Sequence, residues 1–230
     1  MEAQAGTQPD KPVRKQQLRS LRTQQKLLDA ALEAFSENGF KGTSTRDIAE
    51  RAGVHHPLIT YHFKNKEELW RAAASRTFKQ FNRAIYEAYE ETKNDCPRTR
   101  FAAAIRAYVN SAAAQPELHK VILQEASHPS ERLDWIVKSF IRPLFDAAIP
   151  DIKHLQDLGV APPGDPALLF NMIRVSAGGL LALSNEIKGT SDIDMTGQSN
   201  IDALADMIIN VFLPNDAPEN WAQQRAAAGA

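Results

Sequence analysis

The sequence predicts an all-α protein of about nine helices, and three observations lead to that prediction. Apolar residues recur at helical spacing, as Leu21, Leu28 and Phe35 do near the N-terminus. No stretch alternates between apolar and polar residues for long enough to form a sheet. Of the 230 residues, 43% are apolar and 24% are charged, which is typical of a globular protein. The most apolar run, Val175–Leu183, is far shorter than the ~20 residues of a membrane-spanning helix, so we expect no membrane association.

Residues that cap or break helices set the bounds of the predicted elements. Gly39 suits the left-handed position that follows a helix. Ser44 followed by Asp47 has the form of a capping box, with Asp in place of Glu. Pro143 predicts a kink inside its helix. The predicted helices run from Leu18 to Gly39, from Ser44 to Gly53, over 55–61, from Asn65 to Asn94, and over 98–114, 116–127, 130–148, 166–187 and 200–212.

Charge is distributed unevenly along the chain. The segment Lys11–Lys79 contains 14 Lys and Arg against 7 Asp and Glu, whereas residues 80–230 contain 13 against 19. A basic first part suggests a polyanionic partner, although blocks of charge also occur on ordinary solvated faces. We therefore expect a disordered, basic-leaning tail at 1–16, a DNA-binding domain at 17–64, a second helical domain at 65–213 and a disordered tail at 214–230.

The two short helices around Gly53, after a longer one, form a three-helix unit with a candidate helix-turn-helix. Ala49 is small enough for the second short helix to cross closely, and Val54 and Ile59 fill the space between the two. The second short helix can then present its outward side to the major groove of DNA. That side carries His55, His56, Thr60 and Tyr61.

Two runs in this region, Gly42–Val54 (GTSTRDIAERAGV) and Tyr61–Leu69 (YHFKNKEEL), resemble the TetR/AcrR family of bacterial transcriptional regulators. The segment Phe35–Phe40 also fits. The resemblance covers about Leu21–Leu69; the remainder is similar only in helix number and length, and over Ala126–Trp135. It implies a homodimeric, sequence-specific regulator, and specifically a repressor that a small-molecule effector releases from a palindromic DNA operator. The effector, the operator and the regulated genes are not readable from the sequence.

The resemblance also implies roles for individual residues. It assigns contacts with bases or the DNA backbone to His55, His56 and Tyr61. It assigns phosphate contacts to Thr60, His62 and Lys66, joined by Thr45 and Arg46. Lys66 is well placed for this, because the free N–H groups in the first turn of a helix already favour a phosphate.

The chain departs from the family pattern at Pro57 and Thr60, where glycine and tyrosine are common. The helix over 55–61 contains no Arg, Lys, Asn or Gln, so bidentate readout of guanine or adenine from it is excluded. Specificity would then rest on Arg46, on histidine and thymine-methyl contacts, and on DNA shape. Either histidine could instead simply face solvent, and the basic tail could follow the phosphate backbone or only keep the chain soluble.

Family members pair through their last two helices, and both carry apolar stripes here. Gly178 and Gly179 lower helix propensity by ~1 kcal/mol each, and close approach of helices is a reason to keep them. An ordinary intramolecular core is the alternative explanation. The residues expected at the dimer interface are Leu169, Met172, Ser176, Gly179, Leu180, Leu183, Leu204, Ile208 and Val211.

The middle helices of this family enclose a ligand cavity. The residues expected to line it are Tyr108, Leu123, Glu125, His128, Trp135, Phe170, Asn171 and Arg174. Aromatic residues at helical spacing more often form core than pocket. Glu125 and His128 also have a spacing that metal sites use, but a single pair is weak support, and we expect no metal and no cofactor. Arg174 could hold an acidic ligand or form an interhelical ion pair, and the sequence favours the ion pair.

Two other classes of function are less consistent with the sequence. An enzyme is not expected, because the chain contains no GxSxG, GxGxxG, P-loop or HExxH motif. A non-specific architectural DNA-binding protein leaves the acidic second part unexplained. The single cysteine, Cys96, excludes an intrachain disulfide, and the N-terminus has no apolar signal segment, so we expect a cytoplasmic protein.

Overall fold

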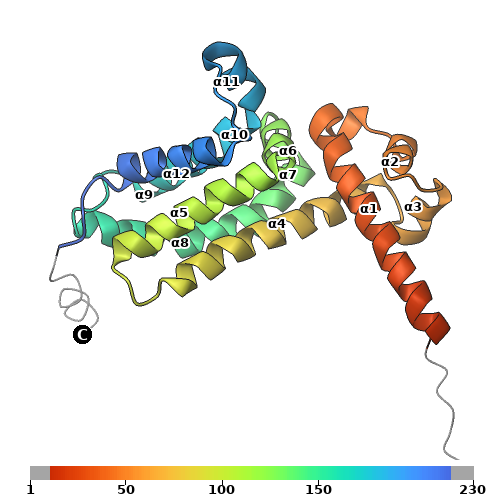
Figure 1. Ribbon diagram of the computed structural model, residues 1–230, viewed down its shortest axis with the longest axis horizontal. Helices are drawn as coiled ribbons and strands as arrows, with labels where there is room; N and C mark the ends of the chain where they lie inside the picture. Colours follow the sequence, from red (N-terminus) through yellow and green to blue (C-terminus); the bar gives the residue numbers. More distant parts are fainter. Residues whose placement is uncertain (1–10, 219–230) are drawn as a thin grey trace, which may run out of the picture. The chain divides into compact units, whose positions relative to one another are not determined.

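The structure is a computed structural model that describes residues 11–218 (Figure 1). These residues form helices and loops and contain no strand. They divide into two compact units, one that extends to Ala74 and one that begins at Ser75. Residues 1–10 of the tail predicted at 1–16 and residues 219–230 of the tail predicted at 214–230 lie outside the described residues. The division falls inside a helix and after the boundary predicted at 64–65.

The first unit consists of α1 (Lys11–Gly42), α2 (Thr45–Arg51), α3 (Pro57–His62) and the first turns of α4 (Lys66–Glu91). Helix α1 begins at Lys11, so residues 11–16 are helical and not part of a disordered tail. Gly39 has a φ of 68° and breaks α1 where the sequence predicts its end. The largest buried side chains of this unit are Leu27, Phe35, Ile48, Leu69 and Trp70. Leu69 and Trp70 explain why the first turns of α4 belong to this unit.

Local capping interactions define the short helices of the first unit. The Ser44 hydroxyl accepts a hydrogen bond from the Asp47 N–H at 3.1 Å, as its capping position predicts. The Asp47 carboxylate forms an ion pair with Arg51, and Arg51 also pairs with Glu37 of α1 at 2.7 Å. The Asn65 side chain caps α4 by accepting from the Glu68 N–H at 2.8 Å. These bonds fix where α2 and α4 begin.

The second unit contains the rest of α4 and the helices that follow it, which pack against one another. The bounds are α5 (Pro97–Ala114), α6 (Pro116–Ala126), α7 (Glu131–Ile136), α8 (Arg142–Asp157), α9 (Pro166–Arg174), α10 (Leu180–Ala182), α11 (Ser184–Ser191) and α12 (Gln198–Phe212). Two π-helical turns, η1 (Val137–Ile141) and η2 (Val175–Gly179), join α7 to α8 and α9 to α10. Helix α5 packs against α12 and η2, and α8 packs against α9.

Two predicted helices differ from the structure. The helix predicted to end at 148 continues through Pro150 to Asp157, because Ile152 and Leu155 beyond the proline are buried in the core. The turn η1 lies just before Pro143, where the sequence predicts a kink. The helix predicted over 166–187 widens at η2 and breaks at Leu183, whose φ and ψ are −94° and 18°. With segments joined through π-turns counted as one, the described residues form ten helices, and α11 is the additional one.

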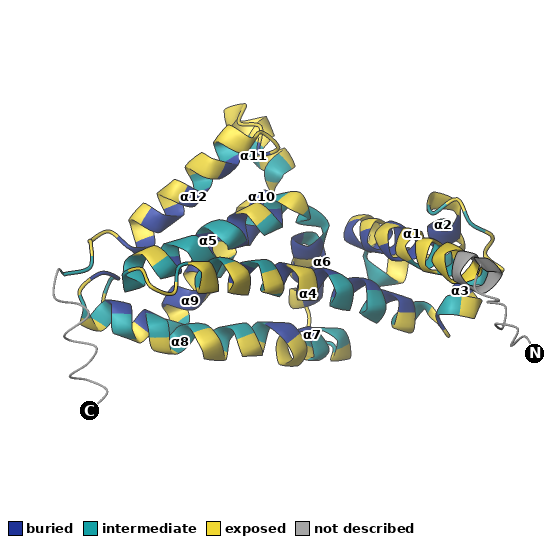
Figure 2. Ribbon diagram, turned by 60° about the horizontal axis from the view of Figure 1, so that its bottom comes forward, coloured by how far each residue is buried: buried dark blue, intermediate teal, exposed yellow. Residues whose placement is uncertain are grey.

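Helix α11 contributes no buried residue to the core (Figure 2). Among the described residues, no single helix combines the length and the apolar composition needed to cross a membrane. Only the pair Pro166–Ala182 and Ser184–Ser191, bent by 75°, meets those two criteria when taken together.

Candidate DNA-binding surface and ligand cavity

The turn between α2 and α3 holds the two short helices at a fixed angle. Gly53 has a φ of 63°, and its N–H donates to the Glu50 carbonyl at 3.0 Å. The Val54 N–H donates to the Ala49 carbonyl, also at 3.0 Å. These two bonds form a Schellman motif, which needs glycine at the left-handed position. Ala49 and Ile59 are both buried, as the sequence predicts.

Burying Ile59 leaves the opposite side of α3 open to solvent. His55, His56, Thr60 and Tyr61 are all exposed, and the exposed fraction of Tyr61 is 76%. His62 is half-buried, and its ring lies 4.9 Å from the Tyr61 ring in an edge-on arrangement. A tyrosine that exposed has its hydroxyl and ring free for a partner. The structure thus brings the residues expected on α3 together on one outward surface.

The start of α2 joins this surface. The Thr45 hydroxyl and His56 Nε2 lie 3.0 Å apart and form a hydrogen bond between α2 and α3. Arg46 is exposed beside them. A polar hollow lies here, lined by Lys41, Thr43, Ser44, Thr45, His56, Ile59, Thr60, Phe63, Lys64, Asn65 and Lys66. We call this hollow, Arg46 and the outward side of α3 with the two histidines before it the α2–α3 surface.

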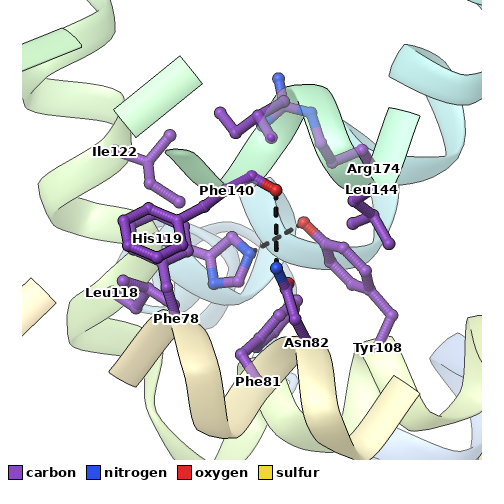
Figure 3. A pocket seen from close by; sticks show the side chains of 11 residues that line it. Phe78, Phe81, Asn82, Tyr108, Leu118, His119, Ile122, Phe140, Leu144 and Arg174 are labelled. Atoms are coloured by element: carbon purple, nitrogen blue, oxygen red, sulfur yellow. Dashed lines mark hydrogen bonds between the residues drawn. The ribbon is translucent and has the colours of Figure 1, made fainter. Parts of the chain in front are cut away.

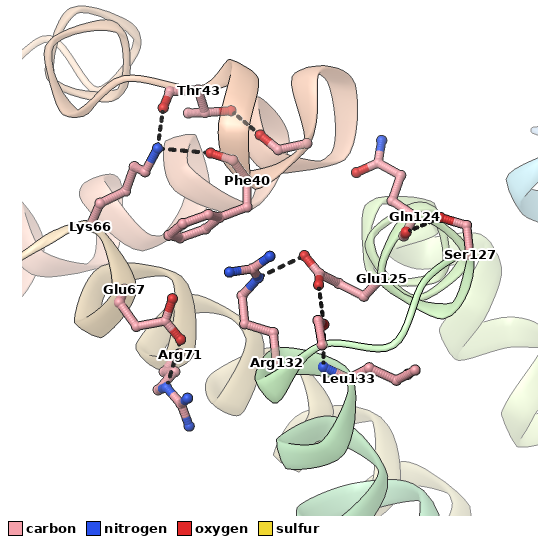
Figure 4. A network of polar contacts seen from close by, with 12 residues as sticks. Phe40, Thr43, Lys66, Glu67, Arg71, Gln124, Glu125, Ser127, Arg132 and Leu133 are labelled. Carbon is pink, nitrogen blue, oxygen red and sulfur yellow. Dashed lines mark hydrogen bonds and ion pairs between the residues drawn. The ribbon is translucent and has the colours of Figure 1, made fainter.

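Lys66 has a structural task as well as a position on this surface. Its ammonium donates to the carbonyl oxygens of Phe40 at 2.8 Å and Thr43 at 2.9 Å, and lies 4.4 Å from the centre of the Phe40 ring (Figure 4). Two of its three N–H donors therefore stabilise the loop that follows α1. Sequence reasoning missed Lys41 and Lys64, which line the hollow and are exposed. The signal that could have identified these two lysines is their positive charge next to, or within, the two runs that resemble the family.

The second unit contains two adjoining cavities between its helices. One, of about 20 Å³, is lined by Phe78, Phe81, Asn82, Tyr108, Leu118, His119, Ile122, Phe140, Ile141, Leu144 and Arg174 (Figure 3). The other, of about 70 Å³, is lined by Ile85, Phe101, Ala104, Ile105, Tyr108, Leu144, Ala148, Phe170, Ile173 and Arg174. We call them the polar cavity and the apolar cavity. Tyr108, Leu144 and Arg174 line both, so the two cavities are neighbours and we treat them as one candidate site.

The polar groups of this site belong to four helices: Asn82 to α4, Tyr108 to α5, His119 to α6 and Arg174 to α9. The Tyr108 hydroxyl and His119 Nε2 form a buried hydrogen bond of 3.0 Å. Burial, and then the nearby Arg174 guanidinium, lower the pKa of His119 to about 4, so the imidazole is neutral at pH 7. Burial also raises the pKa of Tyr108 above its usual value, which keeps its hydroxyl protonated. His119 was missed by sequence reasoning, because its neighbours Glu117 and Lys120 are typical of a surface helix.

The structure places only some of the expected lining residues at these cavities. Tyr108, Phe170 and Arg174 line them. Leu123, His128 and Asn171 are exposed and lie outside both linings, because Leu123 and Asn171 are on the solvent side of their helices and His128 is in the loop between α6 and α7. The other two expected lining residues, Glu125 and Trp135, also lie outside both linings and have other partners.

Glu125 and Trp135 are engaged elsewhere in the second unit. The buried Glu125 carboxylate pairs with the Arg132 Nε at 2.9 Å and accepts from the Ser130 hydroxyl at 3.1 Å (Figure 4). Trp135 packs edge-on against Phe140 at 5.1 Å. Glu125 therefore holds α6 to α7 and is not available as a ligand contact. Within residues 11–218, no group of three or more His, Cys, Asp or Glu could hold a metal ion.

An exposed apolar surface runs along α9–α10 and α12. It contains Leu168, Met172, Val175, Leu180, Leu183, Met207 and Val211, and we call it the apolar stripe. Of the residues expected at a dimer interface, Met172, Leu180, Leu183 and Val211 belong to it, and Ser176, Gly179 and Leu204 are half-buried nearby. Leu169 and Ile208 do not, because both are buried in the core of their own unit.

Gly178 corrects a further expectation. It is buried, and a Cβ at this position would lie 2.1 Å from His119 Cδ2 within the same chain. The close approach that a glycine was expected to allow does occur at Gly178, but inside the unit. At Gly179 a Cβ would meet only Val175, at an ordinary 3.4 Å. Neither glycine therefore points by itself to a partner subunit.

Comparisons with known proteins place the α2–α3 surface in a family context. The profile described as "Bacterial regulatory proteins, tetR family" matches residues 27–73. The HTH-type transcriptional activator FasR of Mycolicibacterium smegmatis is 27% identical over 158 residues, which cover 69% of this chain and 67% of FasR. The class D tetracycline repressor protein of Escherichia coli is 42% identical over 48 residues, covering 21% of this chain and 22% of that protein.

Similarity to solved structures extends over most of the chain. A TetR-like transcriptional regulator from Rhodococcus sp. RHA1 has a TM-score of 0.62 at 19% identity, covering 90% of this chain and 97% of that one. At this identity the likeness concerns the fold alone. The 42% identity to the class D tetracycline repressor protein, by contrast, extends over only 48 residues.

Proposed function

Because the chain belongs to the tetR family of bacterial regulatory proteins, we propose that it is a homodimer that represses transcription from a palindromic operator, and that a small-molecule effector releases it. Transcription regulation, and not catalysis, is the function shared by the named relatives. The observation that carries the proposal is the outward cluster of His55, His56 and Tyr61, held by the Gly53 turn inside the matched segment.

The α2–α3 surface supports DNA binding by its chemistry. Tyr61 and the two histidines present donors and rings to the major groove, while Thr45, Arg46, Thr60, His62 and Lys66 flank them at positions suited to phosphates. Since α3 has no Arg, Lys, Asn or Gln, we expect DNA shape and Arg46 to contribute much of the specificity.

A second copy of the chain is the proposed partner of the apolar stripe. Met172 and Met207 are 56% and 66% exposed, and large apolar side chains clustered on neighbouring helices mark interaction surfaces. A twofold dimer places two reading helices about one DNA turn apart, ~34–36 Å, and requires a palindromic site. The apolar stripe therefore supports a twofold dimer, and through it a palindromic operator.

Helix α4 offers a route from effector to DNA. Its first turns carry Leu69 and Trp70 in the core of the first unit, and its later turns carry Phe81 and Asn82 at the polar cavity of the second. An effector with different affinities for two positions of α4 would shift the population between them. The sign of regulation is part of the proposal, since the named relatives include an activator and a repressor.

Selection of bound duplexes from a random DNA pool tests the proposal. The purified full-length chain is used at about 150 mM salt, because affinity for DNA depends steeply on salt. We expect a palindrome with half-sites about one helical turn apart. Binding without enrichment of any sequence would favour the non-specific architectural protein instead. Enrichment of a single, asymmetric half-site would contradict the dimer.

A further inference from the structure

Arg174 brings a positive charge to the candidate ligand site without an acidic partner. It ends α9 and lines both the polar and the apolar cavity. Its Nε is shielded from solvent and has no hydrogen-bond partner among the described residues. No Asp or Glu lines either cavity, and Arg174 forms no ion pair within the part of the chain that the structure describes. Arg174 as a whole is half-buried, and its guanidinium also bonds to the Tyr108 hydroxyl, so the cation has a polar neighbour in the cavity but no anion to balance its charge.

His119 adds a second unsatisfied group to the same site. Only 4% of the residue is exposed, and its Nε2 is engaged by the Tyr108 hydroxyl at 3.0 Å. Its Nδ1 is buried and has no partner among residues 11–218. Whichever ring nitrogen carries the proton, one polar atom is left without a hydrogen bond. The polar cavity beside it, about 20 Å³, is large enough for one small polar group or one water molecule.

The apolar cavity limits the other end of a ligand. Phe101, Ile105, Phe170 and Ile173 contribute to a wall without charge except at Arg174. Its volume of about 70 Å³ is roughly half of the ~150 Å³ that holds benzene in an engineered cavity. The tail that fits is therefore a short hydrocarbon chain. One arginine, without a second cation in either lining, suits a monoanion better than a phosphate dianion.

We propose that the effector is a short-chain carboxylic acid, bound as the carboxylate. The Arg174 guanidinium and the Tyr108 hydroxyl hold the carboxylate, His119 Nδ1 faces a polar substituent or a water beside it, and the alkyl tail occupies the apolar cavity. This inference rests on the proposed function, because it names the class of effector for the same site. Arg174 directly precedes the π-turn η2, so pairing of its side chain acts on the segment that carries Val175 of the apolar stripe.

Calorimetric titration of the full-length protein tests this assignment with matched ligands. Sodium butanoate and butanamide have almost the same shape and differ in charge. We expect the acid to bind at least about tenfold more tightly than the amide, because a charge-assisted pair with arginine is lost in the amide. In Arg174→Gln the preference for the acid should disappear. In Arg83→Gln, an exposed arginine on α4 of the same unit, the preference should remain.

Each outcome decides for or against the carboxylate. Equal affinity for acid and amide in the wild-type protein overturns the assignment, as does an unchanged preference in Arg174→Gln with native circular dichroism. Binding of neither butanoate nor hexanoate by protein that binds its selected DNA sequence also overturns it and leaves the proposed function standing. A preference for butanoate without any selected DNA sequence would keep the acid site and reject the proposed function.

Discussion

The imidazole ring of His119 lies directly against the backbone of Gly178. A Cβ placed on Gly178 would lie 2.1 Å from His119 Cδ2 and 2.3 Å from Nε2, closer than side-chain atoms ever approach. The contact joins α6 to the π-turn η2 and holds the ring where Tyr108 can bond to it. Glycine is thus required at position 178 by a residue far away in the sequence.

Gly178→Ala should destabilise the protein through this contact. The added methyl group must displace the His119 ring or η2, and overpacking of a core costs about 1–3 kcal/mol in the free energy of unfolding. Gly189→Ala is the matched control, because Gly189 also lies in a helix but has open space around it. There the free energy of unfolding should stay the same or rise by up to about 1 kcal/mol. Urea denaturation followed by circular dichroism measures both. Equal effects of the two substitutions would contradict the steric conflict between position 178 and His119.

The buried His119 should make stability depend on pH. Its pKa is lowered from 6.5 to about 4 in the folded chain, so the unfolded chain binds a proton first as the pH falls. The contribution is complete above pH 6.5, decreases between pH 6.5 and about 4, and amounts to about 3 kcal/mol at most. Denaturation at pH 7 and pH 4.5 should therefore show a smaller difference for His119→Asn than for wild type.

The exposed His128 supplies the control for this experiment. His128→Asn should keep the wild-type dependence on pH, because His128 is exposed in the loop between α6 and α7. If His119→Asn and His128→Asn behave alike, acid destabilisation comes from groups other than the buried ring.

Much of the first unit could be predicted because its signals are local. The Ser44 and Asn65 caps and the Gly53 turn depend on residues three to five positions apart, and all form where the sequence places a helix start or a turn. The predicted helix end at 148 was wrong because it depends on distant residues and not on local ones. A proline predicts a break from its own chemistry, whereas Ile152 and Leu155 keep the helix intact by packing against distant residues.

The candidate site in the second unit was less predictable, because a periodic pattern does not say what each face meets. Leu168 and Leu169 are neighbours of identical chemistry, yet the first is exposed and the second is buried. Helix α9 is apolar on more than one side, so the direction of its core face was ambiguous. His119 escaped notice because its partners Tyr108 and Gly178 lie on other helices. Only the tertiary structure brings these three residues together.

Lys66→Met should lower stability, whereas Lys64→Met should not. Lys66 satisfies the Phe40 and Thr43 carbonyls, and leaving such groups without a donor costs about 1–3 kcal/mol. Lys64 is exposed beside the same hollow. We expect Lys64→Met to keep the unfolding midpoint but to reduce the salt dependence of operator binding. Unchanged unfolding of Lys66→Met would show that its two hydrogen bonds are weak.

Met172→Lys should convert the dimer into a monomer. Met172 is 56% exposed, so the lysine costs little in the monomer but buries a charge in the proposed interface. Sedimentation velocity at micromolar concentration should show half the wild-type mass, with native circular dichroism. Val137→Lys, an exposed apolar residue outside the apolar stripe, should sediment as wild type does. A dimeric Met172→Lys would place the interface elsewhere.

Tyr61→Ala should weaken operator binding while the protein stays folded and dimeric. The Tyr61 side chain is 76% exposed on α3, so its removal leaves no cavity in the core. Loss of one contact with a base or phosphate costs about 1–3 kcal/mol, and a symmetric dimer loses two. We therefore expect at least a tenfold loss of affinity for the selected duplex at constant salt, measured by fluorescence anisotropy. Tyr86→Ala controls for the loss of an exposed tyrosine, since Tyr86 is 65% exposed on α4 in the second unit and should leave affinity unchanged. Equal affinities of the two variants would remove Tyr61 from the DNA-binding surface.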